Sequence, residues 1–89
     1  MYTNHAYARM QQRGIQPVEI EAVLDFGQCE FHQGCEIFSV RKSAAKKLLK
    51  LGKLPHQLLA KMHRIYVVTK GDLIITVGHR YKRLKKERK

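Results

Sequence analysis

The first candidate site is a group of basic side chains on a predicted N-terminal helix. At 100° per residue, one arc of this helix carries His5, Arg9, Gln12 and Arg13. RNA cleavage without a metal needs a base for the 2′-hydroxyl, an acid for the leaving oxygen and cations for the charge at phosphorus. An imidazole beside two guanidiniums can supply these groups, so His5, Arg9 and Arg13 are candidate catalytic residues. A solvated helix face is the alternative interpretation, although such faces usually mix both signs of charge.

A second candidate group lies at the end of the last predicted strand, where His79 and Arg80 follow an apolar run. If Gly71 and Asp72 form a two-residue turn, the register places Arg64 opposite His79 and residue 63, another histidine, opposite Arg80. Titratable and basic side chains would then share the open end of one hairpin. We therefore add His79 and Arg80 to the candidate catalytic residues. The alternative is a solvent-exposed strand end, and a slip of one residue would separate these pairs.

A metal site is a third possibility, because Cys29, His32 and Cys35 have a C-x2-H-x2-C spacing. The sequence offers no obvious fourth ligand nearby, whereas structural zinc is almost always four-coordinate. With a three-residue loop at 32–34, Cys29 and Cys35 become diagonal neighbours on a buried face, so we expect free thiols in the core. Carboxylates that hold Mg²⁺ are scarce in the basic half. We expect neither a metal nor another cofactor.

Charge points to a polyanionic partner. The 89 residues have a formal net charge of +11. Residues 1–40 hold two basic and five acidic residues, a net charge of −3, whereas residues 41–89 hold 16 basic and two acidic residues, a net charge of +14. Basic side chains that neutralise phosphates gain affinity by releasing counterions, so we expect RNA or the ribosome as partner. The candidate nucleic-acid-binding residues are Lys42, Lys46, Lys50, Lys53, Arg64, Tyr81, Lys82 and Arg83. A surface that only keeps the chain in solution is the alternative.

Local signals predict an α+β fold. Thr3 or Asn4 can cap a first helix that Gly14 ends, and Pro17 suits the first turn of a second helix that ends at Gly27. A hairpin at 29–37 precedes a basic helix at 43–52, and strands follow at 62–70 and 73–81. We expect two N-terminal helices packed on an antiparallel sheet of about four strands, with the basic helix inserted between strands two and three.

The length allows one domain, which we assign to residues 1–81, with a basic C-terminal tail at 82–89. No apolar run approaches the roughly 18 residues that a transmembrane helix needs, so we expect no membrane partner. The first residues lack the pattern of a signal peptide, and we expect a cytoplasmic protein.

Three stretches carry a family resemblance: His5-Ala6-x2-Arg9-Met10-x2-Arg13-Gly14-Ile15, Ile20-x2-Val23-Leu24-x2-Gly27, and the late Val67-Val68 and Leu73-Ile74-Ile75-Thr76-Val77. The pattern resembles a family of small, mostly bacterial domains of unknown function whose fold is similar to the RelE/ParE toxin group, the barnase-EndoU-colicin-RelE-like folds. The resemblance implies a metal-independent ribonuclease of a toxin–antitoxin system, with basic and imidazole groups at His5, Arg9 and Arg13 and, more weakly, at His79 and Arg80. The long basic helix departs from this pattern.

The leading hypothesis is therefore an RNA-directed protein, in its catalytic form a RelE-like endoribonuclease. In that form His5 or His79 is the acid or base, an arginine stabilises the phosphorane, and Tyr81 stacks on a base. The second hypothesis is a noncatalytic module that binds RNA or an acidic antitoxin protein through the same face. The third is a small structural domain that forms oligomers.

Overall fold

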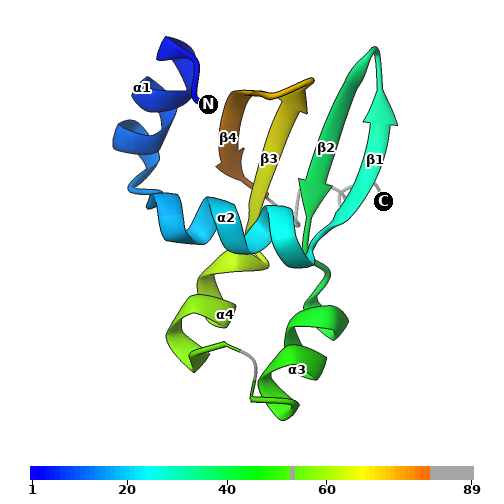
Figure 1. Ribbon diagram of the computed structural model, residues 1–89. Helices are drawn as coiled ribbons and strands as arrows, with labels where there is room; N and C mark the ends of the chain where they lie inside the picture. The colour runs from blue at the N-terminus through cyan, green and yellow to red at the C-terminus, as the bar shows by residue number, and fades with distance from the viewer. Residues whose placement is uncertain (53, 81–89) are drawn as a thin grey trace, which may run out of the picture.

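The computed structural model has an antiparallel sheet with helices against one face and one edge (Figure 1). It describes residues 1–52 and 54–80. The elements in these ranges are α1 (Asn4–Arg13), α2 (Pro17–Phe26), β1 (Gln28–His32), β2 (Cys35–Ser39), α3 (Lys42–Lys50), α4 (His56–Met62), β3 (Ile65–Lys70) and β4 (Leu73–His79). The sheet is a meander with the order β1-β2-β3-β4. The predicted α+β class, the two leading helices and the helical insertion between β2 and β3 are confirmed.

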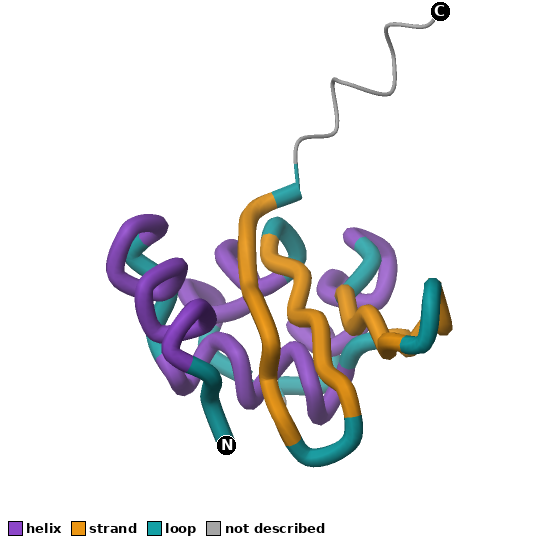
Figure 2. The backbone as a smooth tube through the Cα atoms, turned by 90° about the horizontal axis from the view of Figure 1, so that it is seen from above, coloured by secondary structure: helices purple, strands orange, loops and turns teal. Residues whose placement is uncertain are grey.

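The two N-terminal helices begin and end where local signals predict. The Thr3 hydroxyl oxygen accepts a hydrogen bond from the Ala6 N–H at 3.1 Å, and Gly14 ends α1 in the left-handed region with φ 67°. Pro17 begins α2, where its missing N–H costs nothing. Figures 1 and 2 show α1 beside the β4 edge of the sheet, with the N-terminal residues running next to that strand. Tyr2 forms a parallel bridge with Ile74, so this edge of the sheet is covered.

The core lies between the sheet and the helices α1, α2 and α4. Its largest fully buried side chains are Ile20, Val23, Val40, Met62, Ile65, Val67 and Val77. Burying one such side chain stabilises the fold by about 1.5–3 kcal/mol. These residues come from α2, the end of the first hairpin, α4, the central strand β3 and the edge strand β4. The core therefore fixes the end of α4 against the start of β3 and the end of β4.

The first hairpin differs from the predicted one. Gln33 and Gly34 form a two-residue turn with φ 51° and 82°, so Phe31 pairs with Glu36. Cys29 is exposed and Cys35 half-buried, and the alternation of the ladder places them on opposite faces. The three-residue loop and the pair of core thiols are therefore wrong. Every residue of β1 is exposed, so no buried face selects the register and the turn decides it.

The helical insertion contains two helices, and the second was not predicted. Arg41 is the N-cap of α3, which begins one residue before the helix predicted at 43–52, and Pro55 precedes the seven-residue α4. Leu59 and Met62 of α4 are buried at helical spacing. The strand expected from residue 62 therefore begins three residues later. A helix of two turns is too short for its apolar period to stand out from the β-forming sequence behind it.

The β3–β4 hairpin has the predicted turn at Gly71 and Asp72, but its register shifts between Val68 and Thr69. Thr69 pairs with Ile74 and Val68 with Thr76, which leaves Ile75 as the extra residue of a β-bulge in β4. Ile65 consequently pairs with His79. The predicted pairs Arg64–His79 and His63–Arg80 are wrong.

Two hydrogen bonds hold the shifted register. The Arg80 N–H donates to the Arg64 carbonyl oxygen at 2.7 Å at the end of the hairpin. The Thr3 hydroxyl donates to the Ile75 carbonyl oxygen at 3.0 Å at the bulge. One side chain, Thr3, therefore caps α1 and ties the bulge to it.

Replacing Thr3 by valine should weaken both connections at once. Thr3→Val keeps the branched shape but leaves the Ala6 N–H and the Ile75 carbonyl without this partner. We expect a loss of about 1–2 kcal/mol in the free energy of unfolding, measured by urea titration. Thr3→Ser is the control, because its hydroxyl can make both bonds. Equal stability of the two variants would contradict this role of Thr3.

Candidate functional site

Residues from five elements or their ends meet in one pocket at the end of β4. This β4-end pocket has a volume of about 240 Å³ and is lined by Gly14, Glu19, Ala60, Lys61, Arg64, Ile65 and His79. It joins the end of α1, the first turn of α2, the last turn of α4 and the adjoining ends of β3 and β4. A carboxylate, an imidazole and two cationic side chains thus share one concave surface.

His79 reaches this pocket because of the bulge. Val77 and His79 pair with Val67 and Ile65, whose buried side chains face the helices. His79 is half-buried on that same face, next to the core. Without the extra residue, the alternation of side chains would turn His79 to the other face of the sheet. The bulge is therefore what places the imidazole beside α4.

Glu19 is, with Lys61, one of the two charged residues of this pocket that our sequence reasoning missed. Only 4% of Glu19 is exposed. Its Oε1 accepts a hydrogen bond from the Gln16 N–H at 3.0 Å, and its Oε2 lies 3.6 Å from Lys61 Nζ. The signal that could have found it is the glutamate three residues after the N-cap of α2, a position that reaches back to the cap. Glu19 therefore stabilises α2 while presenting a carboxylate to the pocket.

The candidate residues of α1 lie at different distances from this pocket. Arg13 directly precedes Gly14, which lines it. His5 stands eight positions earlier, which corresponds to about 12 Å along the helix axis. His5 and Arg13 are exposed and Arg9 is half-buried between them. The structure thus brings the C-terminal end of α1 to His79, and His5 lies at the other end of the helix.

The lysines of α3 form an exposed basic surface. Lys42, Lys46 and Lys50 are exposed, and α3 contains no acidic residue. Lys42 and Lys46 lie on the side of α3 that faces α4, where they line a second pocket. Arg80, beyond the end of β4, is half-buried. The predicted binding residues Lys53, Tyr81, Lys82 and Arg83 lie outside the described residues.

The cysteine motif does not form a metal centre in the part of the chain that the structure describes. Within residues 1–52 and 54–80, no group of three or more potential ligands is placed to hold a metal. Cys29 and Cys35 are on opposite faces of their hairpin. Partial desolvation, followed by the carboxylates of Glu36 and Glu30, raises the pKa of the Cys29 thiol.

Comparisons with known proteins give a match to one protein family. A family model described as "Domain of unknown function (DUF4258)" matches residues 2–86. No curated protein and no solved structure matches the chain. Among the described residues, no helix is long and apolar enough to span a membrane.

Two substitutions at Glu19 should separate its hydrogen bond from its charge. Glu19→Ala leaves the part-buried Gln16 N–H without its acceptor, and we expect a loss of about 1–3 kcal/mol in unfolding free energy. Glu19→Gln keeps an acceptor oxygen of similar reach and should lose clearly less, since the ion pair with the exposed Lys61 contributes little. Urea unfolding of both variants measures the difference. If Glu19→Gln is as unstable as Glu19→Ala, the charge and not the hydrogen bond dominates.

Proposed function

The chain belongs to the DUF4258 family, whose description states no activity, and we propose that it is an RNA-directed protein that cleaves RNA without a metal in the β4-end pocket. The observation that carries this proposal is the meeting of Glu19, Lys61, Arg64 and His79 in that pocket. Metal-free phosphodiester cleavage requires an acid–base pair with cations beside it. These four side chains have those chemical types.

Each group has a role that follows from its type. Glu19 accepts the proton of the 2′-hydroxyl, and that oxygen forms a bond to phosphorus. Protonated His79 gives its proton to the 5′-oxygen, whose bond to phosphorus breaks. Lys61 and Arg64 stabilise the negative charge that develops on the phosphorane oxygens. The products are a 2′,3′-cyclic phosphate and a 5′-hydroxyl end.

Binding of the RNA strand is assigned to the basic surface outside this pocket. Lys42, Lys46 and Lys50 of α3 are exposed cations without acidic neighbours on their helix. Arg13 and Arg80 adjoin residues that line the β4-end pocket. These side chains would contact phosphates on either side of the reacting one, which gives affinity without reading the sequence.

The proposal includes a relationship to the RelE/ParE group, and the order of elements supports it. Two helices followed by a four-stranded antiparallel meander is the arrangement expected from that resemblance. The helical insertion α3–α4 departs from the simplest toxin pattern. A toxin role would add an acidic antitoxin protein as a second partner, drawn to the same basic surface.

A noncatalytic RNA-binding module is the second candidate, and one observation favours it. The Glu19 carboxylate already accepts the Gln16 N–H and lies near Lys61 Nζ. Both carboxylate oxygens therefore already have a partner, which leaves them less available to a substrate hydroxyl. A chain that binds RNA but leaves it intact would support this candidate.

Cleavage in the presence of EDTA tests the catalytic proposal. We expect wild-type protein to cut single-stranded RNA with EDTA present, and His79→Ala to lower the rate about 100-fold or more, as loss of a general acid does. His32→Ala, at an exposed histidine of β1, is the matched control and should cut normally. RNA binding by His79→Ala should remain, which shows that the variant is folded. A normal rate for His79→Ala would contradict the assignment of His79 as the acid. If wild-type protein leaves the RNA intact, the catalytic proposal is wrong and the noncatalytic RNA-binding module is the remaining candidate.

The salt dependence of binding tests the basic surface of α3. Each phosphate contact with single-stranded RNA contributes about 0.7 to the slope of log K against log salt, so replacing Lys42, Lys46 and Lys50 by glutamine should lower the slope by about 2. Fluorescence anisotropy with a labelled oligonucleotide measures it. Lys70→Gln, at the exposed end of β3, is the control and should leave the slope nearly unchanged. An unchanged slope in the triple variant would place the RNA elsewhere.

A further inference from the structure

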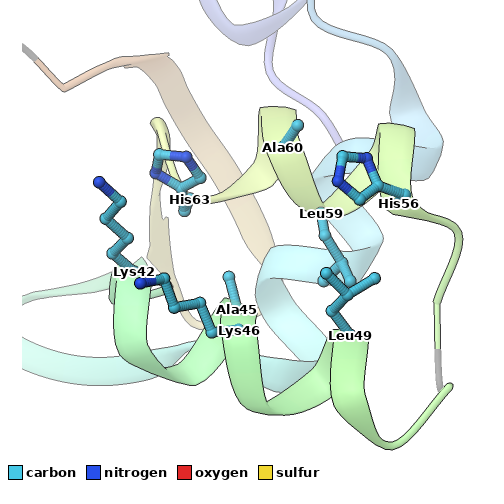
Figure 3. A pocket seen from close by; sticks show the side chains of 8 residues that line it. All are labelled: Lys42, Ala45, Lys46, Leu49, His56, Leu59, Ala60 and His63. Atoms are coloured by element: carbon cyan, nitrogen blue, oxygen red, sulfur yellow. The ribbon is translucent and has the colours of Figure 1, made fainter.

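A second pocket lies between α3 and α4, and neither the acid–base chemistry nor the salt-dependent contacts account for it (Figure 3). This α3–α4 pocket is lined by Lys42, Ala45, Lys46, Leu49, His56, Leu59, Ala60 and His63. Its surface is mostly apolar and comes from the alanines and leucines. Figure 3 shows two imidazole rings on the α4 side and two lysine side chains on the α3 side. The pocket therefore combines aromatic rings, an apolar floor and positive charge.

The size of the pocket fits one flat ring. Its volume is about 120 Å³, and it is open to solvent. An apolar cavity of about 150 Å³ holds one benzene ring, so a slightly smaller pocket with an open side can take a planar group whose edge stays in water. A nucleobase has this character, because its faces are apolar and its edges form hydrogen bonds. Unpaired RNA bases stack on histidine rings among other aromatic side chains.

The pocket adjoins the β4-end pocket along α4. Ala60 of α4 lines both of them, and His63 of the first is followed directly by Arg64 of the second. An RNA strand with a phosphodiester beside His79 would therefore pass the mouth of the α3–α4 pocket. Lys42 and Lys46 at the rim carry the charge that would hold a neighbouring phosphate.

We propose that the α3–α4 pocket holds one unpaired base of the RNA whose phosphodiester lies in the β4-end pocket. The inference rests on the proposed function and specifies its substrate as single-stranded RNA with a base turned out of the strand. His56 stacks on that base, and Leu59 with Ala45 forms the floor beneath it. Base-paired RNA is a poor ligand because its bases are not available to the pocket.

The inference can be tested with a pair of uncleavable 2′-O-methyl oligonucleotides that differ at one position. One carries 2-aminopurine there, whose fluorescence falls when it stacks, and the other is abasic. Stacking on one aromatic platform is worth about 5-fold to 100-fold in affinity, so wild-type protein should prefer the 2-aminopurine strand by a factor in that range and quench its fluorescence.

The decisive variant is His56→Ala, because His56 is exposed and lies at the start of α4. We expect it to reduce the preference for the 2-aminopurine strand about 3-fold or more while binding the abasic strand as wild type does. Gln57→Ala changes the adjacent exposed residue, which does not line the pocket, and should behave as wild type.

Three results would overturn the inference, and together they separate it from the function it rests on. If wild-type protein binds both strands equally and with the same salt dependence, the protein binds RNA but the α3–α4 pocket does not hold a base. Binding of neither strand at low salt would remove the proposed function and the pocket's role together. In a third outcome, wild-type protein binds an acidic leucine-containing peptide and His56→Ala does not, while the preference of His56→Ala between the two strands equals that of wild type. The pocket would then bind a protein partner, and the inference would be wrong.

Discussion

One extra residue in β4 decides which side chains meet at the end of the sheet. Because Ile75 bulges, Ile74 and Val77 both face the core, and His79 follows on the same side. A regular strand would place residues 74, 76 and 78 inward and turn the imidazole away from α4. The bulge is held from outside the sheet, since the Thr3 hydroxyl that caps α1 also donates to the Ile75 carbonyl. The cap of the first helix and the position of the candidate acid are therefore linked through a single side chain.

The acidic and basic residues of this protein differ in their roles as well as in their positions along the chain. In the acidic first half, Glu19 is buried and stabilises the start of α2, whereas Glu30 and Glu36 belong to the first hairpin. The cations of the second half that the structure describes lie on or beside α3, at the end of α4 and near the ends of β3 and β4. A polyanion would meet these elements together, because the two pockets share Ala60 on α4. Within residues 41–80, the positive charge that the structure describes lies mainly on the helical insertion and the adjoining strand ends.

Features specified by neighbouring residues could be predicted from the sequence, and features specified by distant contacts could not. Thr3, Gly14 and Pro17 act within one helical turn, and Gly71 with Asp72 forms a turn from its own backbone preferences. The bulge depends on a hydrogen bond between residues 72 positions apart, which no local pattern contains. The same limit applies to the site. His79 and Arg64 could be named from their types and their places at strand ends, but Glu19 joined them only through the packing of α2 against α4.

The five histidines provide the most direct test of where RNA binds, because they are distributed over α1, β1, the α3–α4 pocket and the β4-end pocket. We would record the imidazole resonances by NMR while adding an uncleavable single-stranded RNA at low salt. The account predicts that the resonances of His79 and His56 shift with the same apparent Kd, while those of His5 on the first turn of α1 and His32 at the end of β1 stay in place. A titration in which His5 shifts and His79 does not would contradict the account, since the RNA would then lie at the opposite end of α1 from the β4-end pocket.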